Sequence, residues 1–262
     1  RVSDGRYVIY AIGRRYISDS LYGPWTESNF YFDKRGRAIV AGTDTTVSLS
    51  NITFARRQDN SFLAVDRGGG VWISKDGIAA YRHITDHTVY NGNRRYLEDP
   101  VVWRDSLQYH MIVNDWNARK AYYSRSLDGL HWITEPGTAY EPGVSVHQDG
   151  SVELWYKYER PKIYMDESGR ASYINFAVID TVKAADLASD NHSAKNIVLP
   201  LNKGLLMEVL NQDTVSESTA AIKVLIKGDS LFHPNTDLNV SSLVFGKYSE
   251  VDYGRGAKAV SS

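Results

Sequence analysis

Three stretches of this sequence repeat one layout, and that repeat constrains the fold more than any other feature. Each unit has a strand-like run, a turn, a second strand-like run and then a serine–glycine turn, and the second halves of the units lie at residues 16–25, 70–77 and 121–132. A unit of about 40 residues matches a four-stranded propeller blade. A blade buries both faces against its neighbours, so its strands are apolar on both sides, whereas the strands of a β-sandwich, the alternative, alternate more cleanly. The repeat therefore favours a β-propeller.

Short β-branched and aromatic runs occur throughout the first two thirds of the chain, at residues 7–12, 61–65, 108–113 and 173–179. Turn residues precede each run, at residues 4–5, 59–60, 104–106 and 166–169. This combination is typical of β-hairpins. No segment has a long helical period, so the sequence predicts an all-β chain.

The pattern changes after residues 199–201. Residues 221–227 alternate apolar and polar side chains, as a half-exposed strand does, and residues 241–246 indicate another strand. We therefore predict a β-propeller domain in residues 1–203 and a small, β-sandwich-like accessory domain in residues 204–262. The second domain is short for a stable sandwich, which suggests that it is truncated.

Composition excludes several classes of function. The 262 residues carry 30 Lys and Arg against 31 Asp and Glu, a net charge of -1 that offers no basic field for nucleic acid. The chain has no cysteine, which excludes disulfides, thiolate zinc sites and a cysteine nucleophile. No apolar run approaches the ~20 residues of a membrane span. The chain begins at Arg1 within a strand-like pattern, so we expect a trimmed or processed form, and the lack of a leader does not argue for a cytoplasmic location.

The first candidate for chemistry is Asp99, in the segment Leu97-Glu98-Asp99-Pro100-Val101-Val102-Trp103. Proline forces an extended conformation on the residue before it and marks the start of a strand. The innermost strand of a blade lines the central channel, so Asp99 is expected to point into it. A turn aspartate that caps the strand start is the competing interpretation.

The second candidate is Glu159, in Tyr158-Glu159-Arg160-Pro161-Lys162-Ile163-Tyr164. This segment again has an acid before a proline and an apolar strand, so Glu159 is expected to start one blade as Asp99 starts another. Two carboxylates near aromatic residues are the groups that glycoside hydrolysis uses. An ordinary salt bridge is the alternative for Glu159.

These two segments resemble the second and third catalytic motifs of glycoside hydrolase family 43 and its relatives. The resemblance covers about residues 1 to 180 and implies a five-bladed β-propeller, incomplete in this chain, and hydrolysis of plant or algal glycans with inversion. It also implies that Glu159 is the general acid and that Asp99 is the auxiliary carboxylate that orients it and tunes its pKa.

Two features depart from the family pattern. The family's general base is an aspartate at the first strand of the first blade, and the spacing places it upstream of Arg1, outside this chain. In addition, Arg160 follows Glu159 where the family commonly has glycine.

Further residues are candidates for substrate binding. Arginines in the channel would favour a uronic or sulfated sugar, and aromatic rings stack on sugar faces. The set is Arg67, Trp72, His110, Asp115, Trp116, Trp155 and Arg160. A satisfied core histidine is the stronger interpretation of His110, and no cofactor is required, although a structural calcium ion in the channel is an option.

The sequence thus predicts a glycosidase that acts on a poly- or oligosaccharide. It is expected to be bacterial and secreted, periplasmic or at the cell surface. A noncatalytic carbohydrate-binding propeller and a polysaccharide lyase on a propeller scaffold remain as alternatives. The sugar, the linkage and the oligomeric state are not set by the sequence.

Overall fold

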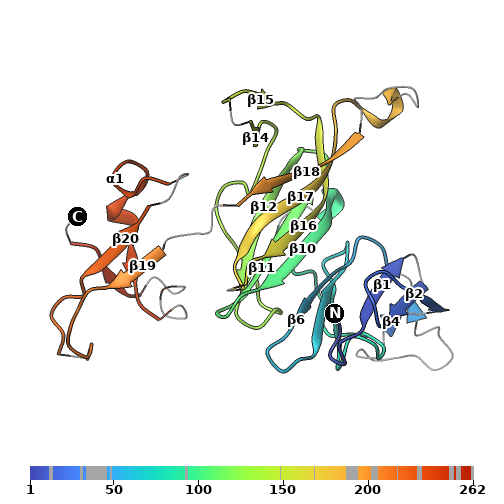
Figure 1. Cartoon of the computed structure of the whole chain (residues 1–262), viewed down its shortest axis with the longest axis horizontal. Helices are drawn as coiled ribbons and strands as arrows, with labels where there is room; N and C mark the ends of the chain where they lie inside the picture. Colours follow the sequence, from blue (N-terminus) through green and yellow to red (C-terminus); the bar gives the residue numbers. More distant parts are fainter. Residues whose placement is uncertain are drawn as a thin grey trace. The chain divides into compact units, whose positions relative to one another are not determined.

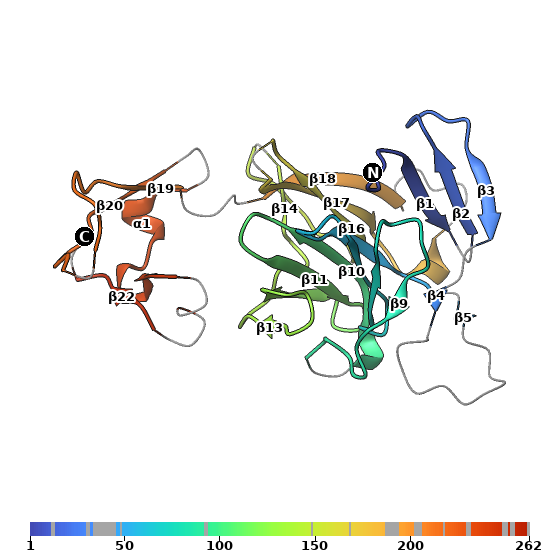
Figure 2. The same cartoon turned by 90° about the horizontal axis from the view of Figure 1, so that it is seen from below.

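The computed structural model shows an all-β chain (Figures 1 and 2). It describes residues 1–11, 14–29, 32–33, 46–47, 49–91, 94–147, 149–167, 169–186, 194–201, 206–216, 218–228, 232–247, 251 and 255–260. The chain divides into two compact units, Arg1–Leu201 and Asn202–Ser262. Within the described ranges, no helix is both long and apolar enough to cross a membrane.

The first unit is built from successive sheets, in which every described pair of strands is antiparallel except the parallel pair β4–β9. Strands β1 (Tyr7–Ala11), β2 (Arg14–Ser18) and β3 (Thr26–Asn29) form one sheet. Strands β6 (Thr53–Arg56), β7 (Phe62–Val65), β8 (Val71–Ser74) and β9 (Arg82–His83) form the next, and β4 (Phe32–Asp33) and β5 (Thr46–Val47) extend it beyond β9.

Two further sheets follow along the chain. After the short 3-10 helix η1 (Arg94–Tyr96), one sheet contains β10 (Leu97–Arg104), β11 (Tyr109–Asp115), β12 (Lys120–Ser126) and β13 (Ile133–Thr134). After the small hairpin of β14 (Ser145–Val146) and β15 (Val152–Glu153), the other contains β16 (Lys157–Met165), β17 (Ala171–Ile179) and β18 (Ala194–Pro200), with the 3-10 turn η2 (Lys183–Ala185) before β18.

The first strands of these sheets lie next to one another. Strand β10 packs against both β6 and β16, and the backbone N–H of Val102 donates a hydrogen bond of 3.1 Å to Thr53 Oγ1 across β10 and β6. In Figure 2, β10 and β16 run side by side. Sheets that meet through their first strands are arranged as neighbouring propeller blades, and the described sheets do not close into a ring.

Alternate residues of single strands enter different hydrophobic cores. In β7, Phe62 and Ala64 belong to the cluster shared with Val2 and Phe32, whereas Leu63 and Val65 belong to the next one. Strands β10 and β11 also contribute to two clusters, and the remaining cluster includes Trp155, Tyr158 and Phe176. Both faces of a sheet are therefore buried against neighbouring sheets. This is the packing of a propeller, and it confirms the predicted fold over a two-layer sandwich.

The repeated serine–glycine turn has the same structure in two blades. The hydroxyls of Ser74 and Ser126 accept hydrogen bonds from the backbone N–H groups of Gly77 (3.1 Å) and Gly129 (2.9 Å). Both glycines have a left-handed backbone, with φ of +82° and +79°. At Gly129, an added Cβ would collide with Leu63 Cδ1 of the preceding blade. The turn therefore needs glycine for its backbone and for blade-to-blade packing.

The second unit contains two small sheets. Strand β19 (Leu206–Val209) pairs with β20 (Val224–Lys227), and β21 (Val244–Phe245) pairs with β22 (Ala257–Lys258). The one-turn helix α1 (Pro234–Asp237) and the 3-10 turn η3 (Val240–Ser242) lie between them in the sequence. None of the side chains described in this unit is buried, so they form no sandwich core.

Candidate functional site

The starts of β10 and β16 have the same irregular backbone. The register of β10 with β11 shifts between Glu98 and Val101, and that of β16 with β17 shifts between Glu159 and Lys162. The residue in each bulge that precedes proline has a left-handed backbone, with φ of +49° at Asp99 and +54° at Arg160. Glu98 therefore corresponds to Glu159, and Asp99 corresponds to Arg160.

This correspondence differs from the sequence-based expectation, which paired Asp99 with Glu159. The reason is that Pro100 and Pro161 each follow a glutamate by two residues, and the bulged residue lies between the glutamate and the proline. Sequence reasoning missed Glu98 as a site residue, although its distance from Pro100 equals that of Glu159 from Pro161.

Asp99 joins three strands through its carboxylate. Its side chain is buried, and the backbone N–H of Arg160 donates to Oδ2 at 2.9 Å. The Arg160 guanidinium lies 3.1 Å from Oδ1, and the side-chain amide of Asn51 donates to the same oxygen. Asn51 lies two residues before β6 and also has a left-handed backbone, with φ of +48°. Asn51, Asp99 and Arg160 thus hold together the starts of β6, β10 and β16.

Glu98 has a raised proton affinity. Burial raises its pKa above the ordinary value, and the charges of Asp99 and Glu159 raise it further. Arg67, whose guanidinium Nη2 lies 2.9 Å from Glu98 Oε2, acts in the opposite direction, as does Lys157. A carboxyl group with a raised pKa keeps its proton to higher pH, which suits a proton donor.

Glu159 is more accessible than Asp99. Its Oε1 lies 2.8 Å from Lys157 Nζ, and its side chain is 34% exposed.

Tyr140 is a buried residue that senses the charges of these carboxylates. Its hydroxyl donates to Asn114 Oδ1 at 3.3 Å, and burial together with the charges of Asp99 and Glu159 raises the pKa of Tyr140. We call the set of three acids and their three cationic partners the acidic cluster; it consists of Glu98, Asp99, Glu159, Arg67, Lys157 and Arg160.

The structure therefore brings four of the predicted site residues together, namely Asp99, Glu159, Arg67 and Arg160. Asp115 and Trp116 lie at the same end of the β10–β11 pair, since Asp115 is paired with Leu97 and the Trp116 N–H bonds to Tyr96. Asp115 Oδ1 accepts hydrogen bonds from the backbone N–H groups of residues 117 and 118, so it caps the turn there.

Three other predicted residues, Trp72, Trp155 and His110, lie outside the acidic cluster. Trp72 is buried, donates to Asp66 Oδ2 at 2.7 Å and stacks on His83. Trp155 is buried in the core beside Tyr158, so neither tryptophan offers a ring face to a ligand.

His110 lies at the opposite end of the strand pair from Glu98, because it is paired with Trp103. Its ring is held by Asp105 at 2.9 Å and by the Tyr123 hydroxyl at 2.6 Å, and it stacks on Trp103. Burial works to raise the Asp105 pKa, but hydrogen bonds from Gln108, Leu107 and His110 outweigh it and lower that pKa. Both ring nitrogens of His110 thus have hydrogen-bond partners, which agrees with the stronger of its two interpretations.

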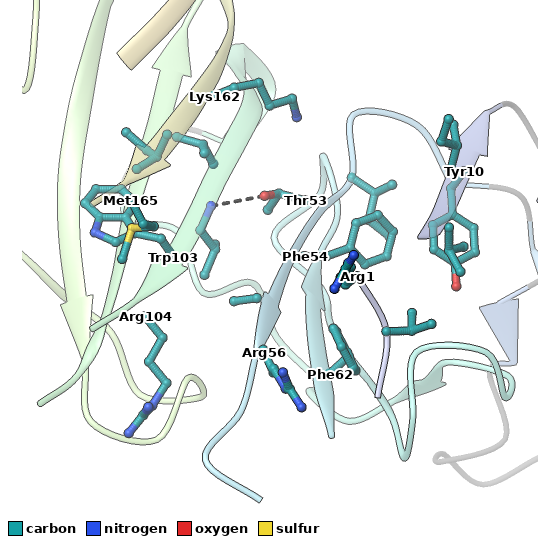
Figure 3. Close-up of a pocket in the computed structure, with 18 of the residues that line it drawn as sticks. Arg1, Tyr10, Thr53, Phe54, Arg56, Phe62, Trp103, Arg104, Lys162 and Met165 are labelled. Carbon is teal, nitrogen blue, oxygen red and sulfur yellow. Dashed lines mark hydrogen bonds between the residues drawn. The ribbon is translucent and has the colours of Figure 1, made fainter. Parts of the chain in front are cut away.

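A cavity of about 670 Å³ runs along β6, β10 and β16 beyond the acidic cluster (Figure 3). Its described lining includes Arg56, Arg104 and Lys162 but no carboxylate. Calcium requires several oxygen ligands, usually with carboxylates among them. This lining therefore does not fit the structural calcium ion that the sequence analysis gave as an option for the channel. Among the residues that the structure describes, no group of three or more His, Asp or Glu side chains could hold a metal.

Comparison with known proteins gives structural resemblances alone. No protein-family model and no curated protein matches the chain. Three solved structures illustrate the resemblances that were found. A xylan β-1,4-xylosidase from Bacillus halodurans is 13% identical over 75% of this chain and 41% of its own, with a TM-score of 0.45. A fructofuranosidase from Schwanniomyces occidentalis is 14% identical over 73% of this chain and 38% of its own, with a TM-score of 0.46. A GH43 endo-arabinanase from Bacillus licheniformis is 13% identical over 77% and 72%, with a TM-score of 0.41.

The chain thus spans well under two thirds of the length of the first two of these enzymes. All three identities are low, so a function for the chain has to be drawn from the side chains of its own site.

Proposed function

We propose that this chain is part of a glycoside hydrolase that acts on a plant or algal poly- or oligosaccharide outside the cytoplasm. The observation that carries the proposal is the acidic cluster, in which Glu98, Asp99 and Glu159 gather at the starts of neighbouring first strands. Hydrolysis of a glycosidic bond needs one carboxylic acid to protonate the leaving oxygen and a second carboxylate to activate water or to attack.

The side chains of the cluster suit different parts of this chemistry. Glu159 is the general acid in this proposal, because its segment resembles the third catalytic motif of family 43 and its side chain is 34% exposed, whereas Glu98 is 16% exposed and is held by Arg67. Asp99 is the auxiliary carboxylate, because three hydrogen-bond donors fix it in place next to Glu159 on the adjoining strand. The proposed mechanism is inverting, in which a second carboxylate acts as the general base and activates water on the opposite face of the sugar.

The test is a hydrolysis assay of the full-length protein with plant and marine oligosaccharides. We expect new reducing ends with the wild type and a loss of about 10²- to 10⁴-fold with Glu159→Gln, the range for removal of a general acid. Glu141→Gln, which changes an exposed glutamate outside the cluster, is the matched control and should keep full activity. The anomeric configuration of the first product, read by NMR, tests inversion.

Two outcomes would contradict the proposal. A rise in absorbance near 235 nm that accompanies each new reducing end would indicate an unsaturated uronate and hence a lyase. Sugar binding without any cleavage, in the wild type as in Glu159→Gln, would indicate a noncatalytic binding propeller.

A further inference from the structure

The cavity beside the acidic cluster contains cationic side chains without acidic partners. Arg56, Arg104 and Lys162 line it, and none of them forms an ion pair with the residues that the structure describes. Arg104 contacts the ring of Tyr109, at 5.6 Å from its centroid. Other arginines of the same unit do have acidic partners, namely Arg6, Arg14, Arg57, Arg67, Arg125 and Arg160.

The two arginines occupy corresponding positions. Arg56 is the last residue of β6 and Arg104 is the last residue of β10, and the hydrogen bond between Thr53 and Val102 sets these strands in register. Both side chains therefore lie at the end of the cavity that is farther from Glu98. Arg104 lies six residue steps of extended strand after Glu98, a distance of roughly 20 Å. Figure 3 shows Arg56 and Arg104 at one end of the cavity and Lys162 at the other.

Unpaired cations around one cavity produce a positive potential that attracts anions. A guanidinium group presents a planar fork of donors that matches a carboxylate or a sulfate ester and binds it through two hydrogen bonds. Trp103, Phe54 and Met165 line the same cavity and offer apolar surface beside the charges. This lining would bind a saccharide that carries a negative group better than a neutral one.

We infer that the Arg56–Arg104 end of the cavity binds an oxyanion carried by a saccharide, either a sulfate ester or the carboxylate of a uronic acid. The saccharide part of this inference rests on the proposed function. The oxyanion part rests on the cavity itself and is tested by binding alone.

The experiment is calorimetric titration of the full-length protein at low salt with three probes. These are a κ-carrageenan tetrasaccharide, which carries sulfate esters and no carboxylate, trigalacturonate, which carries carboxylates and no sulfate, and neutral xylotriose. We expect at least one anionic probe to bind, and xylotriose to bind more weakly by tenfold or more. A preference for the first or the second probe distinguishes sulfate from carboxylate, and competition by sodium sulfate measures the oxyanion contribution.

The variants Arg56→Gln and Arg104→Gln should each weaken binding of the anionic probe by about tenfold or more, since each removes charge-assisted hydrogen bonds to the oxyanion. Arg82→Gln, on strand β9 and outside the lining of the cavity, is the matched control and should bind as the wild type does. Arg56→Lys and Arg104→Lys keep the charge and the aliphatic stem, so they should fold and lose part of the affinity.

Equal binding of neutral and anionic probes, or unchanged affinity in both glutamine variants, would overturn the inference. A protein that binds the anionic probe and cleaves nothing would uphold the oxyanion site while refuting the proposed hydrolysis. A protein that cleaves neutral oligosaccharides and binds no anionic probe would uphold the proposed hydrolysis and refute the oxyanion site.

Discussion

Replacing Asp99 with asparagine tests whether this carboxylate holds the first strands together. In the folded protein its Oδ1 faces the Asn51 amide and the Arg160 guanidinium, and its Oδ2 faces the Arg160 backbone N–H. All of these groups are donors. An asparagine side chain would present its own NH₂ to one side, so at least one buried donor would lose its acceptor.

The expected cost follows from these contacts. A buried backbone N–H without an acceptor costs ~1–3 kcal/mol, and the loss of charge weakens the remaining hydrogen bond from Asn51. The Arg160 side chain is 61% exposed, so its ion pair adds less than ~1 kcal/mol. We therefore expect Asp99→Asn to lower the free energy of unfolding of the first unit by about 2–4 kcal/mol.

Urea denaturation followed by tryptophan fluorescence measures this change, because all 6 tryptophans lie in residues 1–201. Asp115→Asn is the matched control. Its Oδ1 accepts two backbone N–H groups in an accessible turn, and asparagine keeps that acceptor, so the change should stay within ~0.5 kcal/mol. If Asp99→Asn were as stable as Asp115→Asn, the joining role of Asp99 would be refuted.

Two more predictions concern blade packing and pH. Gly129→Ala should lower the free energy of unfolding by about 2–4 kcal/mol, because it adds left-handed backbone strain and a Cβ in contact with Leu63. Gly169→Ala is the control, because residue 169 has a φ of +78° but no atom lies within 4 Å of the added Cβ. It should therefore show the backbone strain alone, about 1–2 kcal/mol. Burial and the neighbouring carboxylates raise the Glu98 pKa above 4.5, so the folded wild type binds this proton more tightly than the unfolded chain does. The wild type therefore loses stability as the pH rises from the pKa of Glu98 in the unfolded chain to its higher pKa in the folded protein. Thermal unfolding of Glu98→Gln against the wild type should therefore show a difference that shifts in favour of the variant between pH 4 and pH 7, and a pH-independent difference would contradict the assignment.

The hairpins could be predicted because their signals are local. Turn residues at 59–60, 104–106 and 166–167 do connect β6 to β7, β10 to β11 and β16 to β17. The serine–glycine turns were also visible, because the Ser126 hydroxyl and the left-handed Gly129 are three residues apart in the sequence.

Contacts between blades could not be predicted in the same way. Trp72 and Trp155 have the composition of sugar-stacking residues, but neighbouring sheets bury them. Whether an aromatic ring faces a core or a ligand depends on what packs over it, and single-strand patterns do not contain that information. The role of Glu98 was hidden for a related reason, because a one-residue bulge changes which side chain of a strand faces its neighbours.

The bulge also accounts for a difference at residue 160, where this chain has arginine and the family that its sequence resembles commonly has glycine. Its φ of +54° lies in the left-handed region, where glycine is unstrained and arginine costs ~1–2 kcal/mol. The contact that matters for Asp99 is the backbone N–H of residue 160, which any residue except proline supplies. The guanidinium contributes an exposed ion pair, which offsets part of the strain.

Arg160→Gly should therefore leave the free energy of unfolding within about 1 kcal/mol of the wild type, because the relieved strain and the lost ion pair act in opposite directions. The same urea denaturation measures it, with Arg160→Ala as the control that loses the ion pair but keeps the strain. We expect Arg160→Ala to be the less stable of the two by about 1 kcal/mol. If the two variants were equally stable, residue 160 would not be held in the left-handed region, and the equivalence of Arg160 with Asp99 would fail with it.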